Sequence, residues 1–535
     1  MNHRDAMTSS QGSNWPELPT ARLKNVGSVP LTDVPELSLD EFQALVTTAP
    51  QRHQRVCALF SHREPDGLRT GSLAIFVVLA SDAASQIHVA RTRVSGTSIA
   101  SMTPTCTQVQ LFERDIAERH GLFFEGHPWF KPVRFLADGG RTTQMNAPPV
   151  TADPFGRDGQ HPKTVGLMDF YRVEGEEVHE VAVGPVHAGV IEPGHFRFQC
   201  HGEQVMHLEI PLGYQHRGVE RGMIEGNPLR RIHYMETLAG DTSVGHATAY
   251  CQLLEELSGC RPTAKAHAIR AIGLELERLA NHVGDLGALA GDVGFLPTAS
   301  YCGRLRGDFL NLSAAICGSR FGRTLVRPGG VGHDIDAILS AQMGKQLRLV
   351  MKDVHNALEL LWDAATVQAR FEGTGSVTSA IAEELGLVGV AARASGLERD
   401  VRHDHPSGFY RLAQIPMSVL STGDVFARGH VRWLEVLRSA QFIEEQLESL
   451  PDGTLRKPLA AVAPGRLAVS LVEGWRGEIC HVAVTDAAGE LETYRVYDPS
   501  FHNWFGLQMA LRNQQISDFP LCNKSFNLSY CGHDL

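Results

Sequence analysis

The stretch IRAIGLELERLANHVGDL (Ile269–Leu286) carries the clearest structural pattern in the chain. Its large apolar residues recur at steps of 3, 4, 3, 4 and 3, at Ile269, Ile272, Leu276, Leu279, Val283 and Leu286. Because an α-helix has 3.6 residues per turn, this spacing places the six side chains in one stripe. The pattern therefore predicts a long helix that faces a protein core.

The regions on either side extend this expectation to the whole chain. Further helices are predicted at 300–321, 334–365, 377–394 and 422–449, and strands return at 466–498. Near the N-terminus, the runs RVCALFSH, SLAIFVVLA and IHVARTRV predict a small antiparallel meander, followed by a helix at Gln108–His120. The predicted fold class is α+β, with a small N-terminal domain and a large, mainly helical one.

A segment rich in glycine and proline separates these two parts. Residues 136–166 hold five Gly and four Pro with little periodicity, which is typical of a linker. We expect a domain at 1–150, with its first ~50 residues partly flexible, and a second at 151–535.

Composition narrows the class of protein. The 535 residues carry a net charge of −11, which disfavours a nucleic-acid binder. The ten cysteines include no CxxC pair, which argues against a zinc ribbon or a self-contained iron–sulfur cluster and fits a reducing cytosol. The first residues have no apolar core, so no secretory signal is predicted. The run LAIFVVLA (Leu73–Ala80) is far shorter than the ~20 residues of a spanning helix, so no transmembrane segment is expected.

Four polar motifs interrupt the apolar pattern. They are GPVHAGVIEPGHFRF (Gly184–Phe198), LGYQHRGVERGMIEG (Leu212–Gly226), YMETLAGDTSVGHATAYCQ (Tyr234–Gln252) and DFPLCNKSFNLSYCGHDL (Asp518–Leu535). Each has an ordinary interpretation, since a histidine in a loop is usually structural and a charged turn is usually solvated. The last motif alternates apolar with small polar residues to its end, so we expect it to be buried and to line a site.

Three of these motifs, all but Tyr234–Gln252, resemble one superfamily together with LERLANHVGDLGAL and RPGG (Arg327–Gly330), and these five stand in the order of that superfamily. It comprises the large subunits of nickel–iron hydrogenases, especially the membrane-bound energy-converting group, and the quinone-site subunit of respiratory complex I. The segment FERDIAERHGLFFEGHPWFKPVRF (Phe112–Phe135) resembles the small complex I subunit that is fused to the large one in several of these systems. The likeness covers roughly residues 50–535.

The hydrogenase metal site is the main departure from this resemblance. In the family, one CxxC at a helix start and a second near the C-terminus hold nickel and iron, because soft thiolates suit a redox-active nickel. The positions in this chain that match the first CxxC are Ala239 and Thr242, and those that match the second CxxC are Ser529 and Gly532. Cys531 is one residue out of register. The resemblance therefore implies no metal site in this chain.

Complex I also lacks these cysteines, and its site takes a quinone headgroup. His195, in EPGHFRF, matches the histidine that contacts the quinone, and Asp292, in LAGDVGFLP, matches the aspartate behind it. The contacting tyrosine is replaced by Gly240. Glu220, in HRGVER, matches a proton-relaying glutamate, and a buried carboxyl can carry protons in a dry interior. The resemblance therefore implies His195, Asp292 and Glu220 as the catalytic set.

Small residues at the helix start predict a widened pocket that faces the C-terminal segment. Its candidate binding residues are Gly240, Asp241, Thr242 and Ser529. The resemblance implies a quinone as the ligand, an iron–sulfur cluster on a small partner subunit, and membrane-embedded partners of the proton-channel type. It implies a peripheral position on the cytoplasmic side of the membrane.

Three functions remain open on these grounds. The first is an oxidoreductase subunit that passes electrons towards a quinone-type acceptor and couples this to proton movement without nickel. The second is an active nickel–iron hydrogenase, which the missing cysteines oppose. The third is a non-catalytic scaffold that holds an iron–sulfur subunit on a membrane arm.

Overall fold

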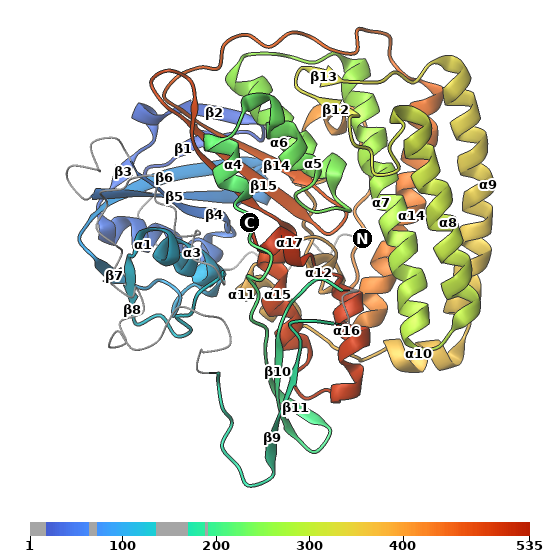
Figure 1. Ribbon diagram of the computed structural model, residues 1–535, viewed down its shortest axis with the longest axis horizontal. Helices are drawn as coiled ribbons and strands as arrows, with labels where there is room; N and C mark the ends of the chain where they lie inside the picture. Colours follow the sequence, from blue (N-terminus) through green and yellow to red (C-terminus); the bar gives the residue numbers. More distant parts are fainter. Residues whose placement is uncertain (1–17, 64–71, 135–169, 188–190) are drawn as a thin grey trace, which may run out of the picture.

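The structure is a computed structural model that describes residues 18–63, 72–134, 170–187 and 191–535. It has the α+β architecture expected from the sequence, with a sheet-rich N-terminal part on the left of Figure 1 and a helical body on the right. The predicted linker at 136–166 and the predicted boundary at 150 lie outside the described residues.

The N-terminal sheet is built on the predicted meander. Strands β4 (Arg55–His62), β5 (Ser72–Ser81) and β6 (Gln86–Ser95) pair antiparallel, while β1 (Ala21–Leu23) and β3 (Glu36–Leu37) pair with β6. Helix α1 (Leu39–Thr47) begins with a capping box, in which Ser38 and Glu41 satisfy each other's backbone amides. Helix α3 (Gln110–His120) confirms the predicted helix in this region.

A second sheet joins the two ends of the chain. Strands β14 (Arg466–Glu473), β15 (Glu478–Thr485) and β16 (Leu491–Tyr497) form the predicted C-terminal sheet, and β2 (Gly27–Pro30) pairs with β14 at its edge. Phe112 of α3 also packs edge-on against Tyr497 and Phe501, at ring-centroid distances of 4.9 and 5.1 Å. Residues from both sides of position 150 therefore share one hydrophobic core.

The helical body confirms the opening pattern. Helix α7 (Ala264–Asp292) begins at the N-cap Thr263, whose side chain accepts from the amide of Ala266, and all six residues of the stripe are 0% exposed. Helices α8 (Leu296–Cys317), α9 (Ala337–Trp362) and α14 (Val425–Glu448) lie beside it (Figure 1). The single helix predicted at 377–394 is wrong. It is two helices, because Gly386 adopts a left-handed φ of 68° and ends the first.

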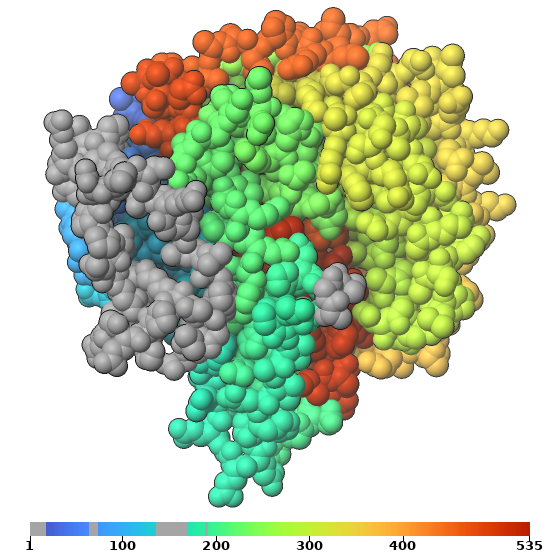
Figure 2. Space-filling view, viewed as in Figure 1, coloured from blue at the N-terminus to red at the C-terminus, as the bar shows by residue number. Residues whose placement is uncertain are grey.

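The C-terminal segment runs through the middle of the molecule. It holds the helices α15 (Pro499–Ala510), α16 (Phe519–Phe526) and α17 (Tyr530–His533), which lie between the C-terminal sheet and a small protruding sheet (Figure 1). In that small sheet, β9 (Val178–Val183) pairs with the hairpin of β10 (Phe196–His201) and β11 (Gln204–Glu209). Asp534 and Leu535 are 0% and 3% exposed, which confirms the predicted burial. In Figure 2 only a narrow red strip of this segment is visible between the hairpin and the helices.

No helix in the described part of the chain is both long and apolar enough to span a bilayer.

The remaining elements connect these parts. The shorter elements are β7 (Ser98–Ala100), β8 (Phe123–Glu125), α4 (Val219–Glu225), α5 (Arg231–Glu236), α6 (Ser243–Leu257), β12 (Val326–Arg327), β13 (Gly330–Val331), α10 (Ala365–Phe371), α11 (Ser379–Leu385), α12 (Gly389–Ala394) and α13 (Val401–Asp404).

Candidate functional site

The start of α6 is held by a network of side chains. The Arg476 guanidinium donates to both carboxylate oxygens of Asp241, at 2.7 Å each. The indole nitrogen of Trp475 donates to the Asp241 carbonyl at 3.0 Å and to the Thr242 hydroxyl at 3.1 Å. These bonds occupy the polar atoms of Asp241 and Thr242, so the two residues shape the helix start.

Gly240 differs from its neighbours because it is exposed. A Cβ atom built on Gly240 would have no atom within 4 Å, whereas Ala239 is 0% exposed. The φ angle of Gly240 is not left-handed, so a side chain here would meet neither backbone strain nor a clash. The structure therefore has open space at the position where the quinone-binding relatives are expected to carry a tyrosine.

A carboxyl from α7 covers the amides of the same helix start. Glu277 accepts from the amides of Val244 and Gly245, at 2.7 and 3.2 Å. Desolvation, together with the nearby charge of Asp241, raises the pKa of Glu277 to about 8, although these amide bonds oppose the shift. At neutral pH this carboxyl is therefore largely protonated.

Ser529 has a structural place in the C-terminal segment. Its hydroxyl accepts from the amide of Gly532 at 2.9 Å and so caps α17, and its own amide donates to the Ser500 hydroxyl at 2.8 Å. The thiol of Cys531 lies 3.4 Å from the Ser529 hydroxyl. Gly532 packs directly on Asp498, since a Cβ there would lie 2.7 Å from the Asp498 Cγ.

Arg476 joins the two segments that the sequence predicted to face each other. While its terminal nitrogens hold Asp241 at the start of α6, its Nε donates to the carbonyl of Asn527 in the C-terminal segment at 2.5 Å. Sequence reasoning missed Arg476 because it lies in the tight turn between β14 and β15, 235 residues from Asp241. The sequence pattern around it, GWRG, signals only a turn.

His195 belongs to a loop that contacts the C-terminal segment. Its Nδ1 lies 3.2 Å from the Gly184 carbonyl, and its ring lies 5.5 Å from that of Phe170. The preceding Gly194 leaves no space for a side chain, because a Cβ there would lie 2.6 Å from a ring carbon of Tyr530 in α17. The histidine loop and the C-terminal helix are thus in contact.

Asp292 lies at the exposed end of α7, where the charge of Lys524 partly offsets a desolvation that raises its pKa. No contact between Asp292 and His195 is found within the described residues. The α7 carboxyl that does reach the C-terminal segment is Asp285, which accepts from the Asn527 amide at 2.5 Å and from Arg432 at 3.0 Å.

Glu220 is buried, as its expected role requires. Its carboxylate accepts from Arg119 of α3 at 2.6 Å, from Arg495 at 3.4 Å and from the amide of Val496 at 2.9 Å. It therefore ties the N-terminal part to β16, the strand on which Val496 lies two residues after Tyr494.

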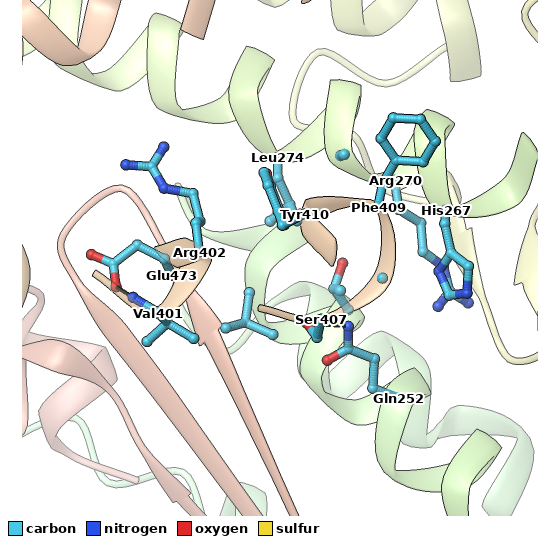
Figure 3. Close-up of a pocket in the computed structure, with 14 residues that line it drawn as sticks. Gln252, His267, Arg270, Leu274, Val401, Arg402, Ser407, Phe409, Tyr410 and Glu473 are labelled. Carbon is cyan, nitrogen blue, oxygen red and sulfur yellow. Dashed lines mark hydrogen bonds between the residues drawn. The ribbon is translucent and has the colours of Figure 1, made fainter. Parts of the chain in front are cut away.

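Two hollows of the molecule lie away from these residues. One is a small cavity of about 20 Å³ between α6, α7 and β14, with room for about one water molecule, and Gln252, Arg402, Tyr410 and Glu473 line it (Figure 3). The other is an open groove of about 690 Å³ lined by aromatic side chains that include Trp129, Tyr171 and Phe505. Neither touches Gly240 or Ser529, so the contact geometry, and not cavity size, locates the candidate site.

Comparison with known proteins shows which family the chain is similar to. Residues 292–534 match the family described as "Respiratory-chain NADH dehydrogenase, 49 Kd subunit". The carbon monoxide-induced hydrogenase of Rhodospirillum rubrum is 30% identical over 353 residues, which cover 65% of this chain and 97% of that protein. The chain belongs to this superfamily of hydrogenase large subunits and complex I 49 kDa subunits.

Relatives from both branches of the superfamily are similar to this chain. Hydrogenase-4 component G of Escherichia coli is 28% identical, over 86% of this chain and 80% of that protein. NADH-quinone oxidoreductase subunit 4 of Thermus thermophilus is 30% identical, over 64% of this chain and 90% of that protein. The long match to hydrogenase-4 component G extends further along this chain than the match to the quinone oxidoreductase subunit.

The donor set of this superfamily member does not fit a nickel–iron centre. Ala239, Thr242, Ser529 and Gly532 offer no thiolate, and Cys531 is a single thiol whose pKa is raised to about 12 by burial and by Glu192. Within the described ranges, no group of three or more His, Cys, Asp or Glu side chains is arranged to hold a metal ion.

Proposed function

We propose that this chain is the acceptor-site subunit of a complex I-like or hydrogenase-4-like membrane complex that works without a nickel–iron centre. It receives electrons from an iron–sulfur partner subunit and passes them to a quinone-type acceptor. Membrane-embedded partners couple this step to proton movement, and the chain lies peripherally on the cytoplasmic side.

The observation that carries this proposal is the open space at Gly240, just before the start of α6. The resemblance assigns the redox chemistry of the superfamily to this helix start and to the C-terminal segment, and in this chain the matching positions carry no thiols. His195 stands beside the same C-terminal segment as the candidate donor to the acceptor. A quinone headgroup is flat and largely apolar, with two carbonyl acceptors, so it needs space and a donor more than charge.

A scaffold function has one specific observation in its favour. Asp241, Thr242 and Ser529 already use their polar atoms within the chain, so each has a structural role without any ligand. A scaffold would keep this network for stability and would need no acceptor at Gly240.

One pair of variants distinguishes the two functions. In the purified complex, Gly240→Tyr fills the open space, and we expect the apparent KM for a short-chain quinone to change by about tenfold, since one buried contact is worth roughly 1–3 kcal/mol. Gly303→Tyr is the matched control, because Gly303 is exposed on α8 and also has no atom near its Cβ position.

The companion variant is His195→Ala, which we expect to lower the rate of quinone reduction. Equal kinetics for wild type, Gly240→Tyr and His195→Ala would contradict the acceptor site and favour the scaffold. Stoichiometric nickel in the matured complex would contradict both.

A further inference from the structure

A chain of four buried side chains runs through the molecule beneath the candidate site. The phenol of Tyr494 lies 2.7 Å from Nδ1 of His481, and Nε2 of His481 lies 3.1 Å from Nδ1 of His246. Nε2 of His246 lies 3.1 Å from a carboxylate oxygen of Asp498. We call this set, which comes from β16, β15, α6 and the N-cap of α15, the histidine chain.

Burial is complete along this path. His246 and His481 are 0% exposed, and Tyr494 and Asp498 are 1% exposed. Two imidazoles in direct contact are an unusual use of a core, because apolar side chains of similar size would pack there without polar atoms to satisfy. Every ring nitrogen of the two histidines has a partner in the chain, so the arrangement is continuous.

The charge states of three members follow from their surroundings. Burial and the adjacent His246 lower the pKa of His481 well below its ordinary value, so His481 is a neutral imidazole. Burial, with the charges of Tyr250, Cys251 and Glu220 added, raises the pKa of Tyr494 well above its ordinary value, so the phenol keeps its proton. Burial opposes ionisation of Asp498, but the bond from His246 and the charge of Arg476 outweigh it and lower its pKa.

These states define one direction of donation. The Tyr494 hydroxyl donates to Nδ1 of His481, Nε2–H of His481 donates to Nδ1 of His246, and Nε2–H of His246 donates to Asp498. A proton that arrives at the Tyr494 oxygen can replace the one that this oxygen passes to His481. His481 then passes its Nε2 proton to His246, which becomes an imidazolium beside the Asp498 carboxylate.

The two ends of the histidine chain lie next to residues already described. Asp498 packs on Gly532 of α17, and His246 lies one helical turn after Thr242, so this end is next to both segments of the candidate acceptor site. At the other end, Tyr494 lies two residues before Val496, whose amide donates to Glu220. We infer that the histidine chain is a proton relay between the region of Glu220 and the acceptor site.

This relay rests on the proposed function for its purpose, but its existence can be tested separately. The charged and titratable groups around it are Arg476, Asp241, Glu220, Tyr250, Cys251 and Cys480. No electron moves in the relay, and each transfer breaks one O–H or N–H bond as it forms the next.

The first test uses quinone reduction by the purified complex. Tyr494→Phe removes the first O–H bond and keeps the ring, and we expect at least about a tenfold lower rate, since a positioned proton-transfer group contributes roughly 10²–10⁴-fold. Tyr250→Phe is the control, because its ring lies 6.1 Å from that of Tyr494 but outside the relay. We expect its rate to stay within about twofold of wild type. Equal rates for the two variants would overturn the relay.

The second test does not depend on quinone activity. The full chain labelled with 15N-histidine is titrated by NMR, and resonances are assigned with His246→Gln and His481→Gln. Protonation of His246 must move the proton of His481 from Nε2 to Nδ1, so a relay predicts that both residues titrate with one midpoint. A titration of His246 alone, or of neither residue between about pH 4 and 9, would overturn it. A wild-type complex that does not reduce quinone would instead contradict the proposed function and leave this test decisive for the relay.

Discussion

Two buried polar networks in this molecule compensate for the loss of hydration in opposite ways. The histidine chain is nearly neutral and depends on groups that exchange protons. The second network, which we call the arginine cluster, packs three guanidiniums among four carboxyls from α7, α12, α13, α14 and β14. Its members are Arg278, Arg393, Arg402, Glu275, Glu435, Glu473 and Asp400.

The difference shows what each network can do. Arginine keeps its charge at every physiological pH, so the cluster is a fixed electrostatic joint that specifies how the helices meet the sheet. A histidine can lose or gain a proton with little change in shape, so the histidine chain can transmit charge. Equal burial therefore does not mean equal function.

Removal of one cluster arginine should have the largest effect on stability. Arg393 donates to Glu435 at 2.6 Å and to Glu473 at 2.8 Å, and it is 0% exposed. Arg393→Met removes a buried positive charge that Glu435 and Glu473 share and leaves the cluster with excess negative charge, so we expect a loss of about 3–5 kcal/mol in the free energy of unfolding by denaturant titration. Arg304→Met, at an exposed ion pair with Asp308, should cost less than about 1 kcal/mol. Similar losses for both would show that the cluster is not a joint.

The one surplus carboxyl of the cluster should make stability depend on pH. Burial and the nearby charge of Asp400 raise the pKa of Glu473 to about 7, although the charges of Arg393, Arg402 and Arg278 oppose this shift. Folding thus favours the protonated form, so this contribution is fully present below about pH 4.5 and is lost as pH rises through 7.

The expected size of that loss is about 3 kcal/mol at most, at roughly 1.4 kcal/mol per pH unit. Glu473→Gln should remove this part of the pH dependence of the free energy of unfolding. A wild-type profile that rises between pH 5 and 8, or a variant with an unchanged slope, would contradict the assignment.

The histidine chain should respond less in stability than in function. His481→Gln keeps a polar side chain of similar reach, so we expect a loss of about 1 kcal/mol, which is typical of a single neutral hydrogen bond. Thermal unfolding of the purified chain measures this, with Arg393→Met as the reference for a large effect. A loss as large as that of Arg393→Met would mean that the two networks share one structural role.

The smallest effect on stability is expected at the candidate site itself. Gly240→Tyr places a side chain in open space, so the free energy of unfolding should change by less than about 0.5 kcal/mol. Gly245→Ala, one turn further along the same segment, should cost more, because its Cβ would lie 2.8 Å from the Ile479 Cδ1. A reversed order would show that the space at Gly240 is filled.

Local patterns in the sequence were sufficient for the elements and their buried faces. The stripe on α7, the three-strand meander and the buried C-terminal segment all follow from spacing and composition, because burial of apolar surface depends on periodicity alone. The superfamily motifs also picked out the start of α6 and the C-terminal segment, which Arg476 bridges in the structure. Gly386 was missed as a helix end, since an isolated glycine is tolerated inside many helices.

Only the tertiary structure decided which polar groups work together. Arg476 reaches Asp241 across 235 residues, and His481 reaches His246 across the same span. Nothing in the local sequence of the turn that holds Arg476 or of the strand that holds His481 marks these two residues. It also showed that Asp285 is the α7 carboxyl that bonds to Asn527 in the C-terminal segment. A hydrogen bond is short and directional, so it depends on the exact placement of distant backbone segments, whereas the apolar pattern needs only a face.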